Sequence, residues 1–163
     1  MRDQWAAQWP DLDTFPVGVV ARVGRLARYF DHGLDQVFTE YGMRREHWDA
    51  LASLRRAGPP FRLSPTDLYR GLMRTSGAMT NRLRRLEADG LIRRVPDPGD
   101  GRGLLVELTE KGRALVDEVA PVHVDNERAM LAALTPAEQQ RFVDLLRKLL
   151  LSFEAGQGPP PRS

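Results

Sequence analysis

The chain has 163 residues, which is long enough for one domain with a buried core or for a domain with helical extensions. Apolar residues make up 42% and charged residues 28%, but the formal net charge is only +2, so a nucleic-acid-binding surface has to be a local basic patch. The lack of cysteine excludes disulfides, thiolate metal sites and thiol-based redox sensing. The sequence has no apolar run of membrane-helix or secretory-signal type, so we expect a soluble cytoplasmic protein.

Two tryptophans stand near the N-terminus, Trp5 and Trp9, in a segment with room for one or two helical turns before Pro10. A bulky aromatic side chain in such a place needs a packing partner. One interpretation is that the tryptophans hold the segment against the core. The other is that one of them forms a wall of a small-molecule pocket.

Two amphipathic helices are expected next. After a linker over residues 11–16, apolar residues recur at three- and four-residue steps from Val17 and predict a long helix that ends near Gly42. The same spacing predicts a second helix over residues 46–57, and the glycine and prolines that follow it end it.

A helix-turn-helix pattern follows, and its second helix carries the most informative surface of the chain. Residues 64–67 (SPTD) predict a helix start with serine as the N-cap, and a brief turn separates this short helix from one that begins at Ser76. In the second helix Met79, Leu83 and Leu86 form one apolar stripe, while the opposite face is small, polar and cationic. Such a face suits a DNA groove, and we expect groove and phosphate contacts from Ser76, Thr80, Asn81, Arg84 and Arg85.

A β-hairpin is expected after this helix, which Gly90 ends. Residues 91–95 and 104–108 are predicted to be strands, and the turn-rich loop 96–103 between them places Arg102 at the tip. A helix followed by such a hairpin is the working part of a winged helix-turn-helix, in which the helix enters the major groove and the wing reaches the DNA backbone or the minor groove. The alternative is an arginine-rich solvated helix followed by an ordinary hairpin.

The C-terminal part is expected to be helical. Thr109 caps a helix in which Pro121 should produce a kink or a break, because proline removes one backbone donor. Residues 135–138 (TPAE) form a capping box and predict a last helix with a continuous apolar face. The Gly/Pro-rich residues 155–163 are expected to be disordered.

The terminal helices carry more apolar surface than one small domain can cover, so we predict a two-fold dimer through both ends of the chain rather than a monomeric bundle. The expected fold class is mainly α with a small β-hairpin wing, a winged helix-turn-helix with N- and C-terminal dimerisation helices. Its expected parts are an N-terminal extension (1–16), a dimerisation helix (17–42), the DNA-binding domain (43–115), the C-terminal dimerisation helices (116–154) and a disordered tail (155–163).

Features of an enzyme are weak. The three histidines, His32, His47 and His123, fall in different helices without metal-ligand spacing, so we expect no metal ion, and no motif indicates a cofactor. The glycine-rich residues of the hairpin loop lie between strands, whereas a phosphate-binding loop leads into a helix. The carboxylates Glu107 and Glu110 straddle a strand end and are interpreted as solvated surface.

Two charged residues on the predicted helices are candidates for a site. Asp49 is four residues from both Arg45 and Ser53, so the simplest interpretation is a local ion pair. Arg82 lies about 60° from the apolar stripe of its helix, and a guanidinium that leans toward the interior needs an anionic partner.

The chain resembles a known family, the MarR family of dimeric winged-helix transcription regulators. The resemblance spans roughly residues 17–153, and its segments are LSPTDL, SGAMTNRLRRLEADGLIRR, the wing DPGDGRG and the following LTEKGRAL. It implies that Arg102 contacts DNA and that Asp100 holds the shape of the wing. Gly101 stands where members often carry a second basic residue.

The N-terminal QWAAQWPDLDT, together with HWDAL, TNRL and GLIRR, is similar to the urate-responsive branch of that family. By this resemblance the ligand residues are Trp5 (rather than Trp9), Asp49, Arg82 and Arg94. Urate is largely a monoanion at neutral pH, so an arginine can pair with it and an indole can face its ring. Its charge would push a nearby carboxylate away, and the change would alter the hold on the recognition helix.

The resulting prediction is a homodimeric regulator, acting as a repressor, that binds a pseudo-palindromic site in double-stranded DNA and releases it when a small anion such as urate binds. Two alternatives stay open. One is a DNA-binding regulator that senses no ligand, or a different aromatic or organic acid. The other is a dimerisation module that does not bind DNA.

Overall fold

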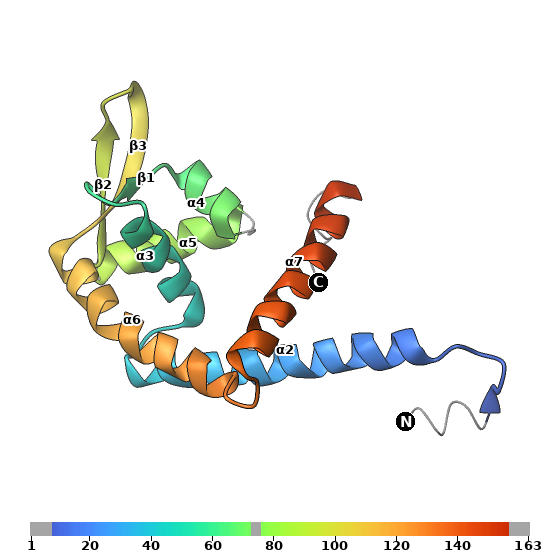
Figure 1. Cartoon of the computed structure of the whole chain (residues 1–163). Coiled ribbons are helices and arrows are strands. Elements are labelled where there is room, and N and C mark those ends of the chain that lie inside the picture. The colour runs from blue at the N-terminus through green and yellow to red at the C-terminus, as the bar shows by residue number, and fades with distance from the viewer. Residues whose placement is uncertain (1–7, 73–75, 157–163) are drawn as a thin grey trace.

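The computed structural model of the chain describes residues 8–72 and 76–156, and it consists of helices packed around a small antiparallel sheet (Figure 1). The expected fold class, mainly helical with a small hairpin wing, is confirmed. Of the helices in these two ranges, none is both long and apolar enough to span a bilayer. In chain order the elements are α2 (Phe15–Glu40), α3 (Arg45–Arg56), β1 (Arg62–Leu63), α4 (Pro65–Leu72), α5 (Ser76–Ala88), β2 (Ile92–Asp97), β3 (Asp100–Leu108), α6 (Glu110–Met130) and α7 (Pro136–Gly156).

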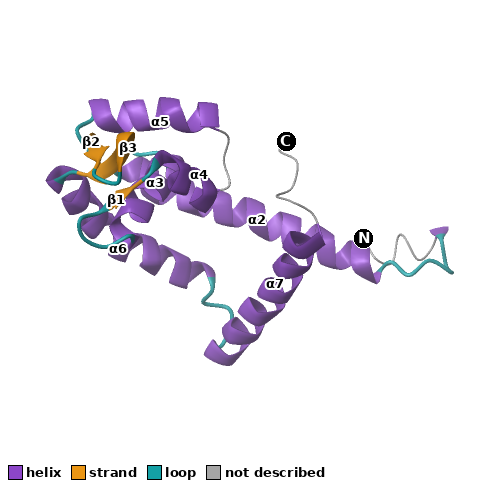
Figure 2. Cartoon of the chain, turned by 90° about the horizontal axis from the view of Figure 1, so that it is seen from above, coloured by secondary structure: helices purple, strands orange, loops and turns teal. Residues whose placement is uncertain are grey.

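The hydrophobic core lies around α3, which contacts α2, α4, α5, α6 and the sheet. Its inner residues, Leu51 and Leu54, are fully buried. Phe38 of α2 stacks on Trp48 of α3 with 5.5 Å between ring centroids, and His123 of α6 lies 5.1 Å from the same indole. The end of α2 and the middle of α6 are thereby joined to the helix-turn-helix, and Figure 2 shows α5 next to the sheet, on the side away from α6.

The predicted helix starts are confirmed by their hydrogen bonds. The hydroxyl of Ser64 accepts a bond from the backbone N–H of Asp67 (3.1 Å) and donates one to the Asp67 carboxylate (2.6 Å). At the start of α7 the backbone N–H of Thr135 donates to the Glu138 carboxylate (2.8 Å), which is one half of a capping box. This bond and a second one from the Thr135 hydroxyl (2.8 Å) hold the pKa of the Glu138 carboxyl below its ordinary value.

Two glycines are required by the junction between α5 and the wing. Gly90 has φ +70°, a left-handed conformation that ends α5 as expected. At Gly112, in the first turn of α6, a Cβ would collide with the backbone carbonyl oxygen of Leu91. The first turn of α6 can therefore pack directly against the start of the wing only because this residue is glycine.

The sheet differs from the prediction in two respects. β2 and β3 extend into the expected loop 96–103 and leave only Pro98 and Gly99 between them, so the predicted loop length is wrong. Pro96 is tolerated within β2 because the strand order is β1-β3-β2, which makes β2 an edge strand. The two-residue strand β1, which pairs with β3, was not predicted because it is too short to show an alternating pattern.

The helices depart from the prediction at Pro121 and, by smaller amounts, at several ends. α6 continues through Pro121, so a break there is wrong. Packing holds this helix on both sides of the proline, with Val119 fully buried before it and the amide of Asn126 donating to the Gly33 carbonyl (3.1 Å) after it. The ends differ less: α2 begins at Phe15 rather than Val17 and ends at Glu40, and α7 reaches Gly156, so the start of the expected disordered tail is helical.

Candidate nucleic-acid interface and ligand residues

The recognition helix α5 has the two faces that its sequence predicts. Leu83 and Leu86 are buried against the body of the domain. Four of the five residues expected to contact DNA are exposed on its other sides: Thr80, Asn81, Arg84 and Arg85. The side chain of the fifth, Ser76, lies outside the described part, although its backbone begins the helix.

Arg84 and Asn81 are hydrogen-bonded to each other on this exposed face. A terminal N–H of the Arg84 guanidinium donates to the Asn81 side-chain carbonyl over 3.3 Å. One edge of the guanidinium is thus held in place while the rest remains available for a base or a phosphate. A bidentate arginine contact is the commonest specific contact to guanine.

The wing is the hairpin formed by β2 and β3. The two strands pair from Ile92 to Asp97, with an irregular register after Pro96, and the Asp97 carboxylate accepts a bond from the Gly99 N–H (2.8 Å) across the turn. Asp100 is exposed next to the turn, and a Cβ on Gly103 would lie 3.3 Å from its carboxylate. Arg102 belongs to β3, but its side chain lies outside the described part, so its contact with DNA remains a prediction.

Several bonds join the base of the wing to the neighbouring helices. The hydroxyl of Thr109 donates to the Gly90 carbonyl (2.7 Å), and Lys111 donates to the Asp89 carbonyl (2.8 Å). On the side facing α5, Arg94 forms an ion pair with Glu87 (3.2 Å). The wing is thereby attached to the recognition helix through its first strand.

On the other face of the sheet, Glu107 is buried, with 4% of its surface exposed, so its interpretation as solvated surface is wrong. Arg93 donates to its carboxylate from Nε (2.6 Å), and Arg62 donates from the opposite side. Burial by itself would raise the pKa of this carboxyl, but the two arginines outweigh burial and hold the pKa below its ordinary value. The group is therefore a carboxylate at neutral pH. Its partner in the earlier interpretation, Glu110, is exposed.

The expected ligand residues lie on different elements. Arg82 is buried, with 7% of its surface exposed, which confirms that it leans inward from α5. Its charge acts on His47 near the start of α3: burial lowers the pKa of that imidazole, and Arg82 and Arg44 lower it further. Asp49 is half-buried two residues further along α3, and its backbone carbonyl accepts the Ser53 hydroxyl (2.8 Å).

Among the described residues, Arg94 contacts other parts of the structure than Arg82 does. Arg94 lines a small cavity of about 70 Å³ with Thr80 and Leu83, which lie roughly 160° and roughly 100° around α5 from Arg82. Trp5 lies outside the described residues, and Trp9 is largely exposed. Arg45, which the sequence placed near Asp49, forms its ion pair with Asp31 of α2.

The histidines lie on α2, α3 and α6, as expected. Over residues 8–72 and 76–156, no three of the histidine and carboxylate side chains come together in a way that would hold a metal ion.

Comparison with known proteins places this architecture in a family. Residues 41–103 match the family model described as the MarR family. The HTH-type transcriptional regulator PecS of Dickeya dadantii is 38% identical over 146 residues, which cover 90% of this chain and 88% of that protein. The chain belongs to the MarR family.

Two solved structures extend the comparison for this MarR-family protein. A mutant MarR from E. coli complexed with operator DNA has a TM-score of 0.75 and 28% identity, and the match covers 86% of this chain and 99% of that one. Bordetella bronchiseptica BpsR, solved to explain the regulation of its DNA binding by 6-hydroxynicotinic acid, has a TM-score of 0.71 and 28% identity over 85% of this chain and 95% of that one. The relatives named as regulators agree with the expectation of a transcriptional regulator rather than an enzyme.

Sequence reasoning missed several residues of this MarR-family site. Arg62, Arg93 and Glu107 form the ion cluster under the wing, and Glu87 pairs with Arg94. The sequence signal was one glutamate in a strand segment and an arginine in each of two other segments. These residues point to an ion cluster only when the strand register is known.

Proposed function

We propose that the protein is a homodimeric transcriptional repressor that binds a pseudo-palindromic DNA site and releases it when a small anionic ligand binds. The observation that carries this proposal is the exposed, cationic face of α5 beside a wing, in a chain whose helices α2 and α7 expose apolar side chains. A DNA-independent dimerisation module would have no use for such a face.

The proposed DNA contacts come from the recognition helix and the wing. The α5 face enters the major groove, and the wing reaches the DNA backbone or the minor groove. Arg84, oriented by Asn81, is the strongest candidate for reading a base. The proposed contact residues are Ser76, Thr80, Asn81, Arg84, Arg85 and Arg102.

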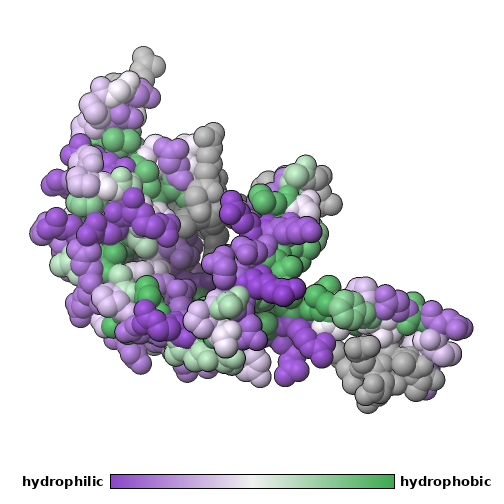
Figure 3. Space-filling model, viewed as in Figure 1, coloured by the Kyte–Doolittle hydropathy of each residue, from purple (hydrophilic) through white to green (hydrophobic). Residues whose placement is uncertain are grey.

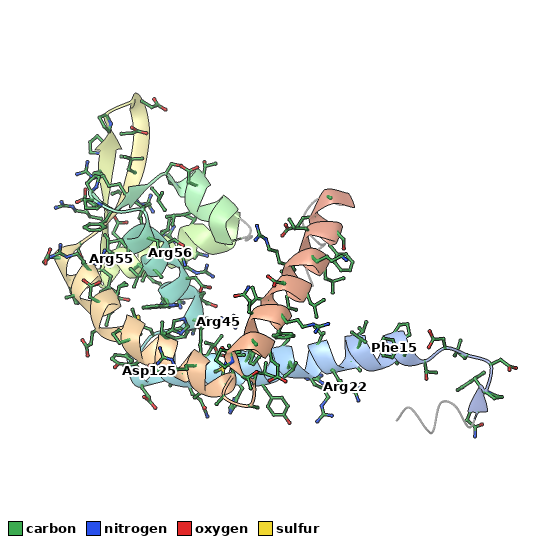
Figure 4. All side chains as sticks on the ribbon, viewed as in Figure 1. Phe15, Arg22, Arg45, Arg55, Arg56 and Asp125 are labelled. Carbon is green, nitrogen blue, oxygen red and sulfur yellow. The ribbon has the colours of Figure 1, made fainter. Side chains whose placement is uncertain are left out.

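The proposed dimer forms through α2 and α7, which act as dimerisation helices around the DNA-binding domain. Figure 3 shows apolar surface along α7 and the adjoining part of α2, and Phe15, labelled in Figure 4, lies on the projecting end of α2. Val20 is 72% exposed and Phe153 62% exposed, which is unusual for apolar side chains on a monomeric protein. A two-fold dimer would present its two recognition helices about 34 Å apart, one turn of B-DNA.

For the ligand we propose urate or a related planar purine anion, with Arg82 as its ion-pair partner and Trp5, Asp49 and Arg94 around it. The support is the inward position of Arg82 on α5 close to α3. An anion bound there would contact the recognition helix on the side opposite its DNA-facing surface. Arg82 lies close to His47 of α3 and Arg94 pairs with Glu87, and we propose that the ligand brings both arginines to itself by shifting α5. A ligand that favours the shifted helix lowers DNA affinity by linkage.

The test is fluorescence anisotropy with a labelled duplex from the upstream region of this gene, compared with a scrambled duplex, with and without urate. Tight and specific binding that urate reverses supports both the DNA and the ligand proposals, and Arg82→Ala should then remove the effect of urate without removing DNA binding. Equal weak binding to both duplexes contradicts the DNA proposal for that site.

A planar aromatic carboxylate is the second candidate ligand. It is favoured by the match to BpsR, whose DNA binding 6-hydroxynicotinic acid regulates, and it presents the same charge to Arg82. Specific DNA binding that ignores urate but responds to this acid would select it.

A further inference from the structure

Glu107, Arg62 and Arg93 form one row across the three strands of the sheet. Glu107 on β3 is the cross-strand partner of both Arg62 on β1 and Arg93 on β2. We call this row the arginine–glutamate bridge. We propose that Glu107 is a positioning residue for DNA binding, because the bridge sets the direction in which the wing leaves the body of the domain. The inference rests on the proposed DNA-binding function.

The bridge lies where the wing meets β1, a very short strand. β1, which leads into α4 of the helix-turn-helix, is two residues long and pairs with β3 at Arg62 and Leu63. One further backbone bond joins the Leu108 N–H to the Phe61 carbonyl (3.1 Å). Past the next pair, Leu63 with Val106, the described strands β2 and β3 pair with each other alone, so a short contact has to orient a longer hairpin.

The length of the hairpin magnifies small changes at its base. Gly101 is six positions along β3 from Glu107, which is roughly 20 Å at about 3.3 Å per residue. A rotation of roughly 10° at the bridge would therefore move the tip by roughly 3.5 Å, more than the length of a hydrogen bond, over that strand distance. An arginine at the tip would lose its contact with DNA while the fold stayed intact.

The bridge is better suited to fixing geometry than to adding stability. Removing a carboxylate from water costs about as much as its ion pairs return, so an apolar residue at this buried position would serve stability equally well. Two planar guanidinium groups from different strands, however, hold the carboxylate in one orientation. On the opposite face the Arg94–Glu87 ion pair ties β2 to α5, so the wing is held from both sides.

The test is a double-mutant cycle on DNA affinity, measured by anisotropy with the upstream duplex. Glu107→Gln keeps the size of the side chain but replaces an acceptor oxygen with an N–H₂ group that faces guanidinium donors. In the native background we expect a loss of about tenfold, the size of coupling found between residues of one network. With Arg102→Ala already present, we expect a loss of less than about twofold, because the wing no longer contributes.

A second readout follows the wing without DNA. The chain has no cysteine, so Gly99→Cys gives a single site for a nitroxide label at the turn, where a Cβ meets only ordinary contacts. Glu107→Gln should sharpen the spectral lines of this label, which reports a more mobile wing. Asp125→Asn is the matched control, because it breaks an exposed arginine–carboxylate pair on α6 (Asp125 is labelled in Figure 4) and should change neither affinity nor spectrum.

The outcomes separate the two proposals. A Glu107→Gln loss of equal size in both backgrounds, or an unchanged label spectrum, overturns the positioning role while leaving DNA binding intact. No specific binding by the native protein contradicts the proposed function, and the label still decides whether the bridge orders the wing. If Glu107→Gln does not fold, as checked by circular dichroism, Arg62→Met replaces it, since this variant cuts only the link to β1.

Discussion

The winged-helix body and the two projecting helices use the same kind of amphipathic sequence in different ways. In the body, the inner residues of α3 and α5, such as Leu51, Leu54 and Leu86, are fully buried by neighbouring elements of the same chain. In α7 and the first half of α2, apolar residues at the same spacing are exposed, and Figure 1 shows both helices extending away from the body. An apolar stripe therefore specifies that a helix needs a partner but not which chain supplies it.

The two regions therefore expose different kinds of surface. The body buries its apolar side chains and leaves a polar, cationic face of α5 for DNA. The projecting helices leave exposed apolar faces, which we propose a second chain covers, so that recognition and assembly occupy separate surfaces. Substitutions in one region should then leave the other function measurable.

The largest effect is expected from Leu149→Asp, which places a charge in the exposed apolar stripe of α7. The variant should be a monomer by light scattering, and its operator affinity should fall at least about 100-fold, because the second recognition helix is no longer linked to the first. Lys148→Asp, on the polar face of the same helix, is the control and should keep the dimer. A native protein that is itself monomeric would contradict the dimer proposal.

The second-largest effect is expected on the stability of the winged-helix body. Leu54→Ala removes a fully buried side chain from the centre of the core, and we expect the free energy of unfolding in urea to fall by about 2–5 kcal/mol. Leu151→Ala is the same substitution at a half-exposed position off the apolar stripe of α7, and it should change stability by about 0.5 kcal/mol or less. Equal costs at the two positions would remove the distinction between the two regions.

Arg84→Ala tests whether DNA recognition can be lost while dimer assembly is kept. If Arg84 reads a base, specific binding should weaken by about 1–3 kcal/mol in the anisotropy assay, with the dimer mass unchanged. If it contacts only phosphate, all sequences should weaken alike and the salt slope should fall by about one unit. Arg141→Ala on α7 is the control, and an Arg84 variant that binds like the native protein would place Arg84 outside the interface.

The smallest effect in the neutral pH range concerns Glu107. Its pKa in the folded protein lies below its ordinary value, so its bonds stabilise the fold at neutral pH and lose this contribution as the pH falls through the folded-state pKa. The difference in unfolding free energy between the native protein and Glu107→Gln should therefore be constant near neutrality, and it should shrink once the pH falls below the ordinary pKa of a glutamate carboxyl and toward the lower folded-state pKa. A difference that does not change with pH would show that the carboxylate charge is irrelevant.

The sequence by itself determined the order of elements and most of their faces. The N-caps at Ser64 and Thr135, the stop at Gly90 and the apolar and polar sides of α5 depend on residues within four positions of one another, so local pattern is sufficient. The apolar stripes of the terminal helices were visible for the same reason. Pro121 shows the limit of this reasoning, because packing on both sides of it kept α6 continuous.

Only the tertiary structure decided the base of the wing and the surroundings of the ligand residues. Arg62, Arg93 and Glu107 are far apart in the sequence, and strand register alone brings them into one row and buries the carboxylate. Likewise, the packing of α5 on α3 places the charged Arg82 close to His47. Arg94 forms an ion pair with Glu87 on another side of α5. Periodicity reports which side of an element is apolar, but a contact between distant segments depends on how the whole chain packs.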